Sequence, residues 1–192
     1  MTHGMLSSFW SFLFYLWFGL EIVISIATRT GKGDGKVSDR GSQLLLWIVI
    51  VSSITACEWL RRILPPNIPD GDHWLKPASV TFLAIGLLVR CVAILSLGRA
   101  FSANVAIRDS QKMNRAGLYR VVRHPSYLGM LIIFFAIGLH SRNWLCLAIA
   151  VVPTTAALLY RIHVEEAALQ EAFGDDYVTY RRETKRLIPG IF

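Results

Sequence analysis

Two stretches of the sequence carry side chains suited to holding a charged small molecule. The first is RHPSYLG at 123–129, which places His124, Ser126 and Tyr127 around Pro125, directly before a run of aliphatic residues. Proline favours the first position of a helix, and the residue before it avoids helical geometry, so we expect a helix to begin at Pro125. The first turn of a helix has unpaired N–H groups that suit a carboxylate or a phosphate. The stretch therefore predicts a ligand-binding helix start.

The second stretch is RIHVEEAALQEAFGDDYVTYRRE, at 161–183. Arg161 and Glu165 are four residues apart, so they share one face of a helix. An exposed pair of this kind stabilises a helix by only about 0.3–0.5 kcal/mol. Stability alone is therefore a weak reason for the pair, and we interpret it as functional. We expect Gly174 to end this helix, and Asp175 or Asp176 to cap a short helix after it.

A purely structural interpretation of the first stretch is equally open on spacing alone. Arg123 would reach lipid headgroups, Pro125 and Ser126 would only start the helix, and Tyr127 would lie in the aromatic belt of a membrane interface. Evidence beyond local spacing has to decide between the two interpretations.

Composition identifies the setting as a membrane. The 192 residues are 54% hydrophobic and 17% charged, and the mean hydropathy is +0.46. About 20 apolar residues span a bilayer as a helix. We therefore expect an all-α polytopic membrane protein with about five transmembrane helices, of which the last two form a hairpin, plus cytosolic loop and C-terminal helices. The expected spans lie at 9–26, 44–64, 77–97, 125–139 and 144–160.

We expect one domain over 1–192, with three membrane helices in 1–97 and the functional half in 98–192. Basic residues set its orientation. Four lie in the loop after the first span, six in 99–123 and five in 161–186, against three after the second span and one at Arg142. This distribution puts the N-terminus outside and both functional stretches on the cytosolic face of an inner or plasma membrane. The net charge of +7 needs only anionic membrane lipid as a partner, not nucleic acid.

Ionisable residues within the apolar spans are costly, by roughly 2.5–3.5 kcal/mol each on insertion scales, and count as functional candidates. Glu58 is one turn from Arg61 and Arg62, so we expect it to reach water in a structural role. Arg90 pairs either with Glu21 or with a polar group of a substrate. The three cysteines lie in apolar stretches without a CxxC pair, which indicates small buried hydrophobes and no metal site.

Taken together, GLYRVVRHPSYLG at 117–129 and EEAALQEAFGDDYVTYRRETKRLIP at 165–189 resemble the isoprenylcysteine carboxyl methyltransferase family. The shared pattern is G-x-Y-x-x-x-R-H-P-x-Y-x-G, then E-E-x-x-L, then F-G-x-x-Y-x-x-Y and proline. The resemblance covers about half of the chain. It implies an integral membrane enzyme that transfers a methyl group from S-adenosyl-L-methionine to the carboxylate of a lipophilic small molecule or prenylated substrate.

The resemblance also implies roles for matched positions. Arg161 and Glu165 match the residues that hold substrate and cofactor, and we assign them as catalytic. Relatives often have His-x-Leu-Val where this chain has residues 111–114, so contacts from backbone atoms are the alternative there. The implied cofactor-binding residues are Gln111, Lys112, Met113, Asn114, Tyr119, His124, Pro125, Ser126, Tyr127 and Glu165.

The chemistry of carboxyl methylation fits these residues independently. A carboxylate is already ionised at pH 7, so the reaction needs alignment, exclusion of water and a cation, but no general base. Arg161 is the candidate cation, because its planar guanidinium suits a carboxylate. No strand followed by GxGxxG occurs, so we expect the cofactor to bind among helix ends and loops rather than on a Rossmann domain.

Three alternatives remain. A phospholipid N-methyltransferase has a similar pattern, but its amine must lose a proton, and His124 is the candidate base. An NADPH-dependent sterol-type reductase typically has Asn in place of Ser126 and an acidic residue where this chain has Met130. A non-enzymatic membrane scaffold predicts no binding of S-adenosyl-L-methionine.

Overall fold

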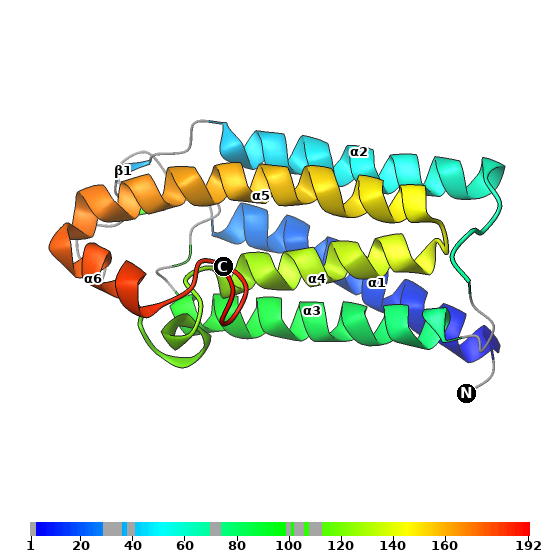
Figure 1. Cartoon of the computed structure of the whole chain (residues 1–192), viewed down its shortest axis with the longest axis horizontal. Helices are drawn as coiled ribbons and strands as arrows, with labels where there is room; N and C mark the ends of the chain where they lie inside the picture. Colours follow the sequence, from blue (N-terminus) through cyan, green and yellow to red (C-terminus); the bar gives the residue numbers. More distant parts are fainter. Residues whose placement is uncertain are drawn as a thin grey trace.

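Five apolar helices form the body of the protein in the computed structural model, which describes residues 3–28, 36–37, 41–69, 74–98, 101, 106–107 and 113–192. The helices run back and forth along one long axis (Figure 1). They are α1 (His3–Ala27), α2 (Ser42–Ile63), α3 (Leu75–Leu97), α4 (Pro125–His140) and α5 (Trp144–Phe173). Four are long and apolar enough to span a membrane, and α4 is a shorter apolar helix. The predicted all-α architecture with five membrane helices is confirmed.

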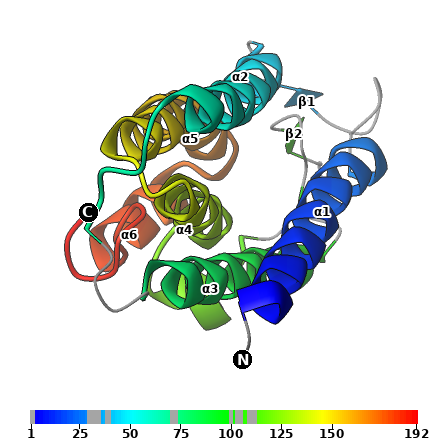
Figure 2. The ribbon, with the colours of Figure 1, turned by 90° about the vertical axis from the view of Figure 1, so that its right-hand side faces the viewer.

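Helix α4 lies in the middle of the bundle (Figure 2). It packs on α3 and α5, α2 packs on α5, and α1 packs on α3. Helices α3 and α4 cross closely at Gly86 and Gly129, where a Cβ on Gly129 would lie 2.8 Å from the Arg90 nitrogen and the Gly86 oxygen. The absence of a side chain at Gly129 therefore admits the backbone of α3.

Helices α4 and α5 form the predicted hairpin. Asn143 caps α5, because its side chain accepts hydrogen bonds from the Leu145 and Cys146 nitrogens. A Cβ on Gly138 would lie 2.6 Å from the Leu147 Cα, so the absence of a side chain there lets the two helices meet directly after the turn. Helix α5 continues past residue 160, the expected end of its membrane span, to Phe173, and Gly174 ends it as predicted. Its last turns extend beyond the start of α4 (Figure 1).

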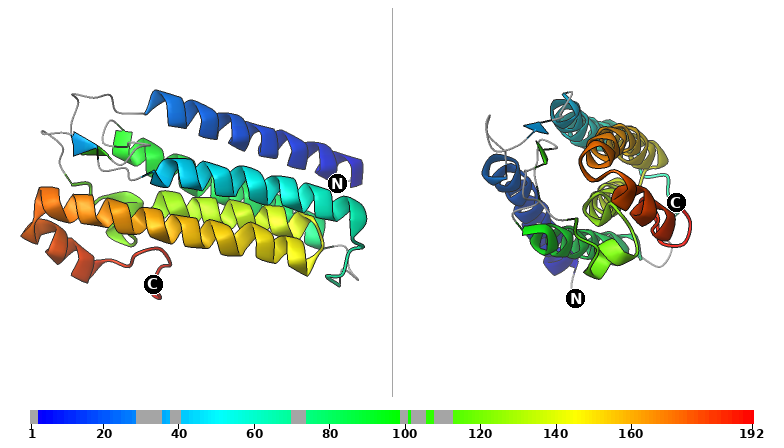
Figure 3. Two further views of the ribbon diagram at one scale, coloured as in Figure 1. Left: turned by 90° about the horizontal axis from the view of Figure 1, so that it is seen from above. Right: turned by 90° about the vertical axis from the view of Figure 1, so that its left-hand side faces the viewer.

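The short elements lie at the end of the bundle that carries the start of α4 (Figure 3). They are a two-residue ladder between β1 (Lys36–Val37) and β2 (Ala106–Ile107), the 3-10 helix η2 (Gly117–Arg120) and α6 (Asp175–Glu183). They bring the loop after α1, the loop after α3 and the C-terminal segment to one end of the protein.

The predicted capping of α6 was wrong. Gly174 both ends α5 and precedes α6, with φ 53° and ψ −126°, and no side chain caps α6. This conformation suits glycine, and it turns the chain so sharply that Asp175 and Asp176 already lie in the first turn of α6. The two carboxylates there interact favourably with the positive end of the helix dipole instead of capping it.

Candidate active site

A hydroxyl group from α4 joins two charged groups on α5. The Tyr127 hydroxyl donates a hydrogen bond to Glu165 Oε2 at 2.7 Å, and it accepts one from Arg161 Nε at 3.0 Å. Arg161 and Glu165 therefore share one helix face, as predicted, and meet through Tyr127. This arrangement contradicts a role for Tyr127 as an aromatic anchor at the membrane interface, because its polar tip points into the protein.

Arg161 is buried, with 4% of its surface exposed. Its Nη1 donates to the Ser42 hydroxyl at the start of α2, at 3.0 Å. Tyr127 and Ser42 thus orient the guanidinium through neutral oxygens. Arg161 also lines a small pocket of about 40 Å³ together with Tyr127, Arg90, Glu21 and Met130.

His124 lies beside both glutamates of the pair at 165–166. Its Nε2 is 3.4 Å from Glu166 Oε1, and its Nδ1 is 3.7 Å from Glu165 Oε2. Its ring stacks on the ring of Tyr127, with centroids 5.6 Å apart. His124 precedes α4 in a non-helical conformation and Pro125 takes the first helical position, both as predicted.

Glu166 is the site residue that sequence reasoning missed. Its buried carboxylate accepts hydrogen bonds from Arg123 Nε at 3.1 Å and from Arg186 Nη2 at 2.9 Å, in addition to the contact with His124. The surplus of basic residues near the two motifs was the signal in the sequence that could have pointed to Glu166. Arginines such as Arg123 and Arg186 require an anionic partner when they are buried or half-buried. Glu166 therefore joins the first motif to the second.

The C-terminal segment holds the residues before α4 through backbone hydrogen bonds. The Arg123 nitrogen donates to the Lys185 oxygen at 2.8 Å, the His124 nitrogen to the Arg186 oxygen at 3.1 Å, and the Lys185 nitrogen to the Val121 oxygen at 3.1 Å. Arg123 Nη1 also donates to the Thr184 carbonyl oxygen at 2.5 Å. The position of His124 is therefore fixed by residues about 60 positions later in the chain.

One tyrosine of each motif, Tyr119 in the first and Tyr180 in the second, is a buried structural donor. The Tyr180 hydroxyl donates to the Tyr119 carbonyl oxygen at 2.6 Å, and the Tyr119 hydroxyl donates to the Ala93 carbonyl oxygen at 3.3 Å. Burial raises the pKa of Tyr180 to about 12 and raises the pKa of Tyr119 as well. Both hydroxyls therefore stay protonated at neutral pH. The predicted cofactor residue Tyr119 anchors η2 on α3 by this side-chain contact.

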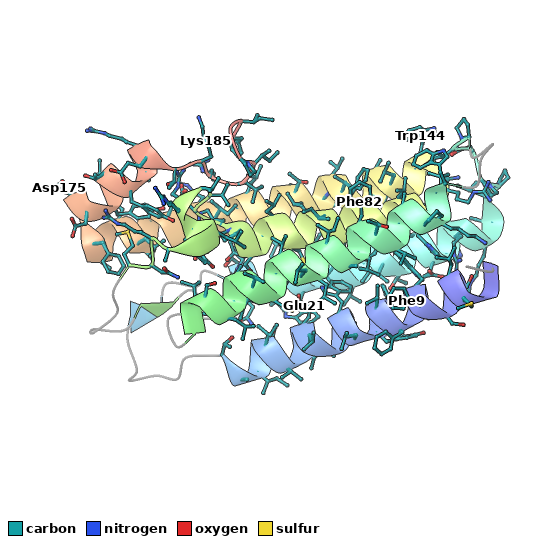
Figure 4. The ribbon with its side chains drawn as sticks, turned by 90° about the horizontal axis from the view of Figure 1, so that it is seen from below. Phe9, Glu21, Phe82, Trp144, Asp175 and Lys185 are labelled. Atoms are coloured by element: carbon teal, nitrogen blue, oxygen red, sulfur yellow. The ribbon has the colours of Figure 1, made fainter. Side chains whose placement is uncertain are left out.

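Ser126 faces the interior of the bundle, where it contacts the buried ion pair of Arg90 and Glu21. Arg90 Nη1 donates to the Ser126 hydroxyl at 2.8 Å, and Arg90 Nη2 donates to Glu21 Oε2 at 2.6 Å. Figure 4 shows Glu21 on α1, between that helix and α3. Of the two partners we expected for Arg90, Glu21 is the one present. Glu58 pairs with Arg61 at 2.8 Å in an exposed position, as predicted.

The predicted cofactor stretch 111–114 is only partly described. Gln111 and Lys112 lie outside the described residues, and Met113 is half-buried. The Asn114 side chain donates to the Ser96 carbonyl oxygen and accepts from the Ala116 nitrogen, both at 2.9 Å. These bonds hold the start of η2 against the end of α3.

The side chains around Tyr127 fit the chemistry of S-adenosyl-L-methionine. The side chain of Glu165 is 29% exposed, so its carboxylate is open to an ammonium group, while the stacked rings of His124 and Tyr127 offer faces to a sulfonium or a base. Within the described ranges, no three His, Cys, Asp or Glu side chains are grouped to hold a metal ion. The site therefore suits an organic cationic cofactor.

Comparisons with known proteins agree with this fit. Residues 79–171 match the model of the isoprenylcysteine carboxyl methyltransferase family. Protein-S-isoprenylcysteine O-methyltransferase B of Arabidopsis thaliana is 30% identical over 175 residues, which cover 88% of this chain and 85% of that protein. Methanethiol S-methyltransferase 2 of Bradyrhizobium diazoefficiens is 39% identical over 123 residues, which cover 64% of this chain and 46% of that protein.

A solved structure shares the fold. The eukaryotic intramembrane Ras methyltransferase, an isoprenylcysteine carboxyl methyltransferase, superposes with a TM-score of 0.60 at 28% sequence identity. The superposition covers 75% of this chain and 52% of that chain. The fold and the motif-bearing half of the chain therefore point to the same group of proteins.

Proposed function

Since the chain belongs to the isoprenylcysteine carboxyl methyltransferase family, we propose that it methylates the carboxylate of an isoprenylcysteine-like or other lipophilic molecule with S-adenosyl-L-methionine. The observation that carries this proposal is the buried guanidinium of Arg161, oriented by Tyr127 and Ser42 and open to a pocket. A fixed guanidinium beside a pocket that is also lined by apolar residues of α1 and α2 suits an acceptor that has both a carboxylate and an apolar chain.

Arg161 holds the carboxylate of the acceptor. Tyr127 fixes the guanidinium at its Nε, and Ser42 fixes it at Nη1, so that one face of its fork is directed at the pocket. Walls contributed by Met130 and Leu46 exclude water from the carboxylate, which raises its reactivity toward a methyl group. The cofactor would supply a methyl group whose bond to sulfur breaks as its carbon bonds to one carboxylate oxygen, so an ester and a neutral thioether would form and no proton would move.

Glu165 and His124 hold the cofactor, which supplies an electrophilic methyl group on sulfur when bound. Glu165 accepts from its ammonium group, and the stacked rings of His124 and Tyr127 lie beside its positive charge. Glu166 keeps His124 in place from the other side. Pro125, Ser126 and Tyr119 complete the cofactor site by shaping η2 and the first turn of α4. The contacts implied for 111–114 belong to this proposal as well, although Gln111 and Lys112 lie outside the described residues.

We place this site on the cytosolic face, with the N-terminus outside. The segments that carry the described basic residues of 113–123 and 161–186 lie at the end of the bundle where α4 starts, which supports this orientation. The cofactor then enters from the cytosol and the acceptor from the membrane.

A small thiol is a second candidate acceptor. The relative from Bradyrhizobium diazoefficiens, a methanethiol S-methyltransferase, is 39% identical over 123 residues, and a pocket of about 40 Å³ beside Arg161 suits a small group. A thiol is protonated at neutral pH, because even the thiol of cysteine has a pKa of about 8.5, so it must lose its proton first and needs a base. Glu21, which lines the pocket, and Glu165, which Tyr127 joins to Arg161, are the candidate groups.

Methyl transfer from labelled cofactor tests the proposal with four acceptors: N-acetyl farnesylcysteine, a farnesyl thioether without the carboxylate, methanethiol and phosphatidylethanolamine. Carboxyl methylation predicts product with the first acceptor alone, and a fall of about 100-fold or more in Arg161→Ala. The matched control is Arg182→Ala, which removes an exposed arginine on α6. Product only with methanethiol selects the thiol candidate.

His124→Gln separates carboxyl from amine methylation. Carboxyl transfer weakens in this variant but persists, because no base is required, whereas amine transfer stops. Methylation of phosphatidylethanolamine by the unaltered protein, abolished in His124→Gln, would establish the amine alternative. Failure of the purified protein to bind labelled S-adenosyl-L-methionine would establish the scaffold alternative.

A further inference from the structure

A second, larger groove lies at the opposite end of the bundle from Arg161. It has a volume of about 500 Å³, within the range of about 300–1,000 Å³ that is typical of small-molecule sites. Its walls come from the first half of α1, the last turns of α2 and the end of α4. Figure 2 looks onto this end, where α1 and α2 lie on different sides of α4. The groove therefore faces outward between two helices on the perimeter of the bundle.

The rim of the groove carries an excess of positive charge. Arg61 and Arg62 are consecutive residues at the end of α2, and both line the groove. Glu58, the only acidic residue among the described lining residues, pairs with Arg61 at 2.8 Å. Arg62 thus contributes positive charge that Glu58 does not balance. Basic residues normally gather at the cytosolic end of a membrane protein, and their distribution favours the other end of this bundle as cytosolic. Membrane orientation therefore does not explain the two adjacent arginines here, whereas binding of a local anion does.

The inner wall of the groove contains aromatic and aliphatic side chains. The ring of His140 stacks face to face on Trp10, with centroids 3.8 Å apart and planes within 1°, and its Nδ1 is 3.2 Å from the Ser79 hydroxyl. Phe14, Ile54 and Ile137 continue the wall toward the middle of the bundle. The groove therefore changes from charged at the helix ends to apolar at membrane depth.

We propose that this groove binds one anionic phospholipid from the leaflet opposite the methyl-transfer site. The phosphate lies against Arg62, whose planar fork suits two phosphate oxygens, and the start of an acyl chain lies along Phe14, Ile54 and Ile137. The apolar inner wall favours a lipid over a free phosphate ion, because burial of the chain adds to the charged contact. The site is independent of the proposed methyl transfer, since the two share no described lining residue.

Native mass spectrometry tests this site. The full chain is mixed in detergent with phosphatidylglycerol and phosphatidylcholine at equal concentrations, and the lipid that it retains after release from the detergent is measured. We expect preferential retention of phosphatidylglycerol and a loss of about tenfold in its affinity in Arg62→Gln, as for the removal of one charged hydrogen bond. Lys76→Gln is the matched control, because it removes a cation at the same end of the bundle that does not line the groove. Methyl transfer stays unchanged in Arg62→Gln.

A second variant tests the charge argument without removing an arginine. Glu58→Gln releases Arg61 from its carboxylate partner, so retention of phosphatidylglycerol should rise several-fold. Equal retention of the two lipids by the unaltered protein, or an undiminished preference in Arg62→Gln, overturns the proposal. A competition experiment separates a lipid from a soluble ligand. If glycerol phosphate displaces bound phosphatidylglycerol as strongly as added phosphatidylglycerol does, the assignment of a lipid is overturned and the site binds soluble phosphate.

Discussion

Tyr127 on α4 and Glu165 on α5 are 38 positions apart in the chain, yet the Tyr127 hydroxyl donates to Glu165 Oε2 at 2.7 Å. The Tyr127 hydroxyl oxygen also accepts from Arg161 Nε, so a single hydroxyl couples the proposed cofactor-binding carboxylate to the proposed acceptor-binding guanidinium. Without this link, Arg161 would keep its hydrogen bond to Ser42 and Glu165 its contact with His124, but the hydroxyl that orients both charges would be lost.

Tyr127→Phe should therefore slow methyl transfer more than it weakens binding of the cofactor. The variant keeps the aromatic ring beside His124 but loses a hydrogen bond to a charged group, worth about 1.5–3 kcal/mol. We expect kcat to fall about 10- to 100-fold while the dissociation constant for S-adenosyl-L-methionine changes by less than about threefold. Steady-state kinetics and calorimetry measure the two effects. An unchanged kcat would contradict the role of the hydroxyl.

Glu166→Gln should lower stability as well as activity. The buried carboxylate is the shared acceptor of Arg123 and Arg186, and breaking a buried ion pair from one side costs about 3–5 kcal/mol. Thermal unfolding in detergent, followed by circular dichroism, measures the loss. Glu183→Gln, an exposed substitution on α6, is the control. Equal unfolding temperatures for both variants would show that Glu166 does not join the two motifs.

Glu21 and Arg90 should show strong coupling in a double-mutant cycle. Glu21→Leu or Arg90→Leu leaves a buried charge unpaired and destabilises the protein by about 3–5 kcal/mol, whereas the double variant buries two apolar side chains and loses much less. Urea or detergent unfolding of the four proteins gives the coupling energy. Additive effects would mean that each side chain acts through other partners.

Gly129→Ala should separate α3 from α4. A Cβ at this position would lie 2.8–2.9 Å from backbone and side-chain atoms of Gly86 and Arg90, and overpacking of this kind costs about 1–3 kcal/mol. Gly19→Ala in α1 is a matched control, because a Cβ there meets nothing within 4 Å. Thermal unfolding should show a lower midpoint for Gly129→Ala only. Equal midpoints would contradict the close crossing.

Features set by residues close together in the sequence were predictable, and features set by residues far apart in the sequence were not. The five apolar helices, the hairpin and the start of α4 at Pro125 were predictable, because runs of apolar residues, prolines and glycines act over a few neighbouring residues. The pairing of Glu166 with Arg123 and Arg186 was not, because it joins residues 43 and 20 positions apart and depends on how the C-terminal segment folds back.

The same distinction applies within the candidate site. Spacing put Arg161 and Glu165 on one face of α5, but only the packing of α4 on α5 brings Tyr127 between them. Ser126 shows the limit of a local argument: its place in the first turn suggested a ligand, while the turn of the helix directs its hydroxyl toward Arg90 in the bundle.

Because of the backbone hydrogen bonds between 121–124 and 185–186, the residues before α4 reach their final position only after the C-terminal segment has been synthesised. During translation the five apolar helices leave the ribosome before Lys185 and Arg186, so they enter the bilayer while the chain still lacks the hydrogen bonds that fix Arg123 and His124. A nascent chain inserted in the membrane is thus unable to hold His124 in place until synthesis has passed those residues.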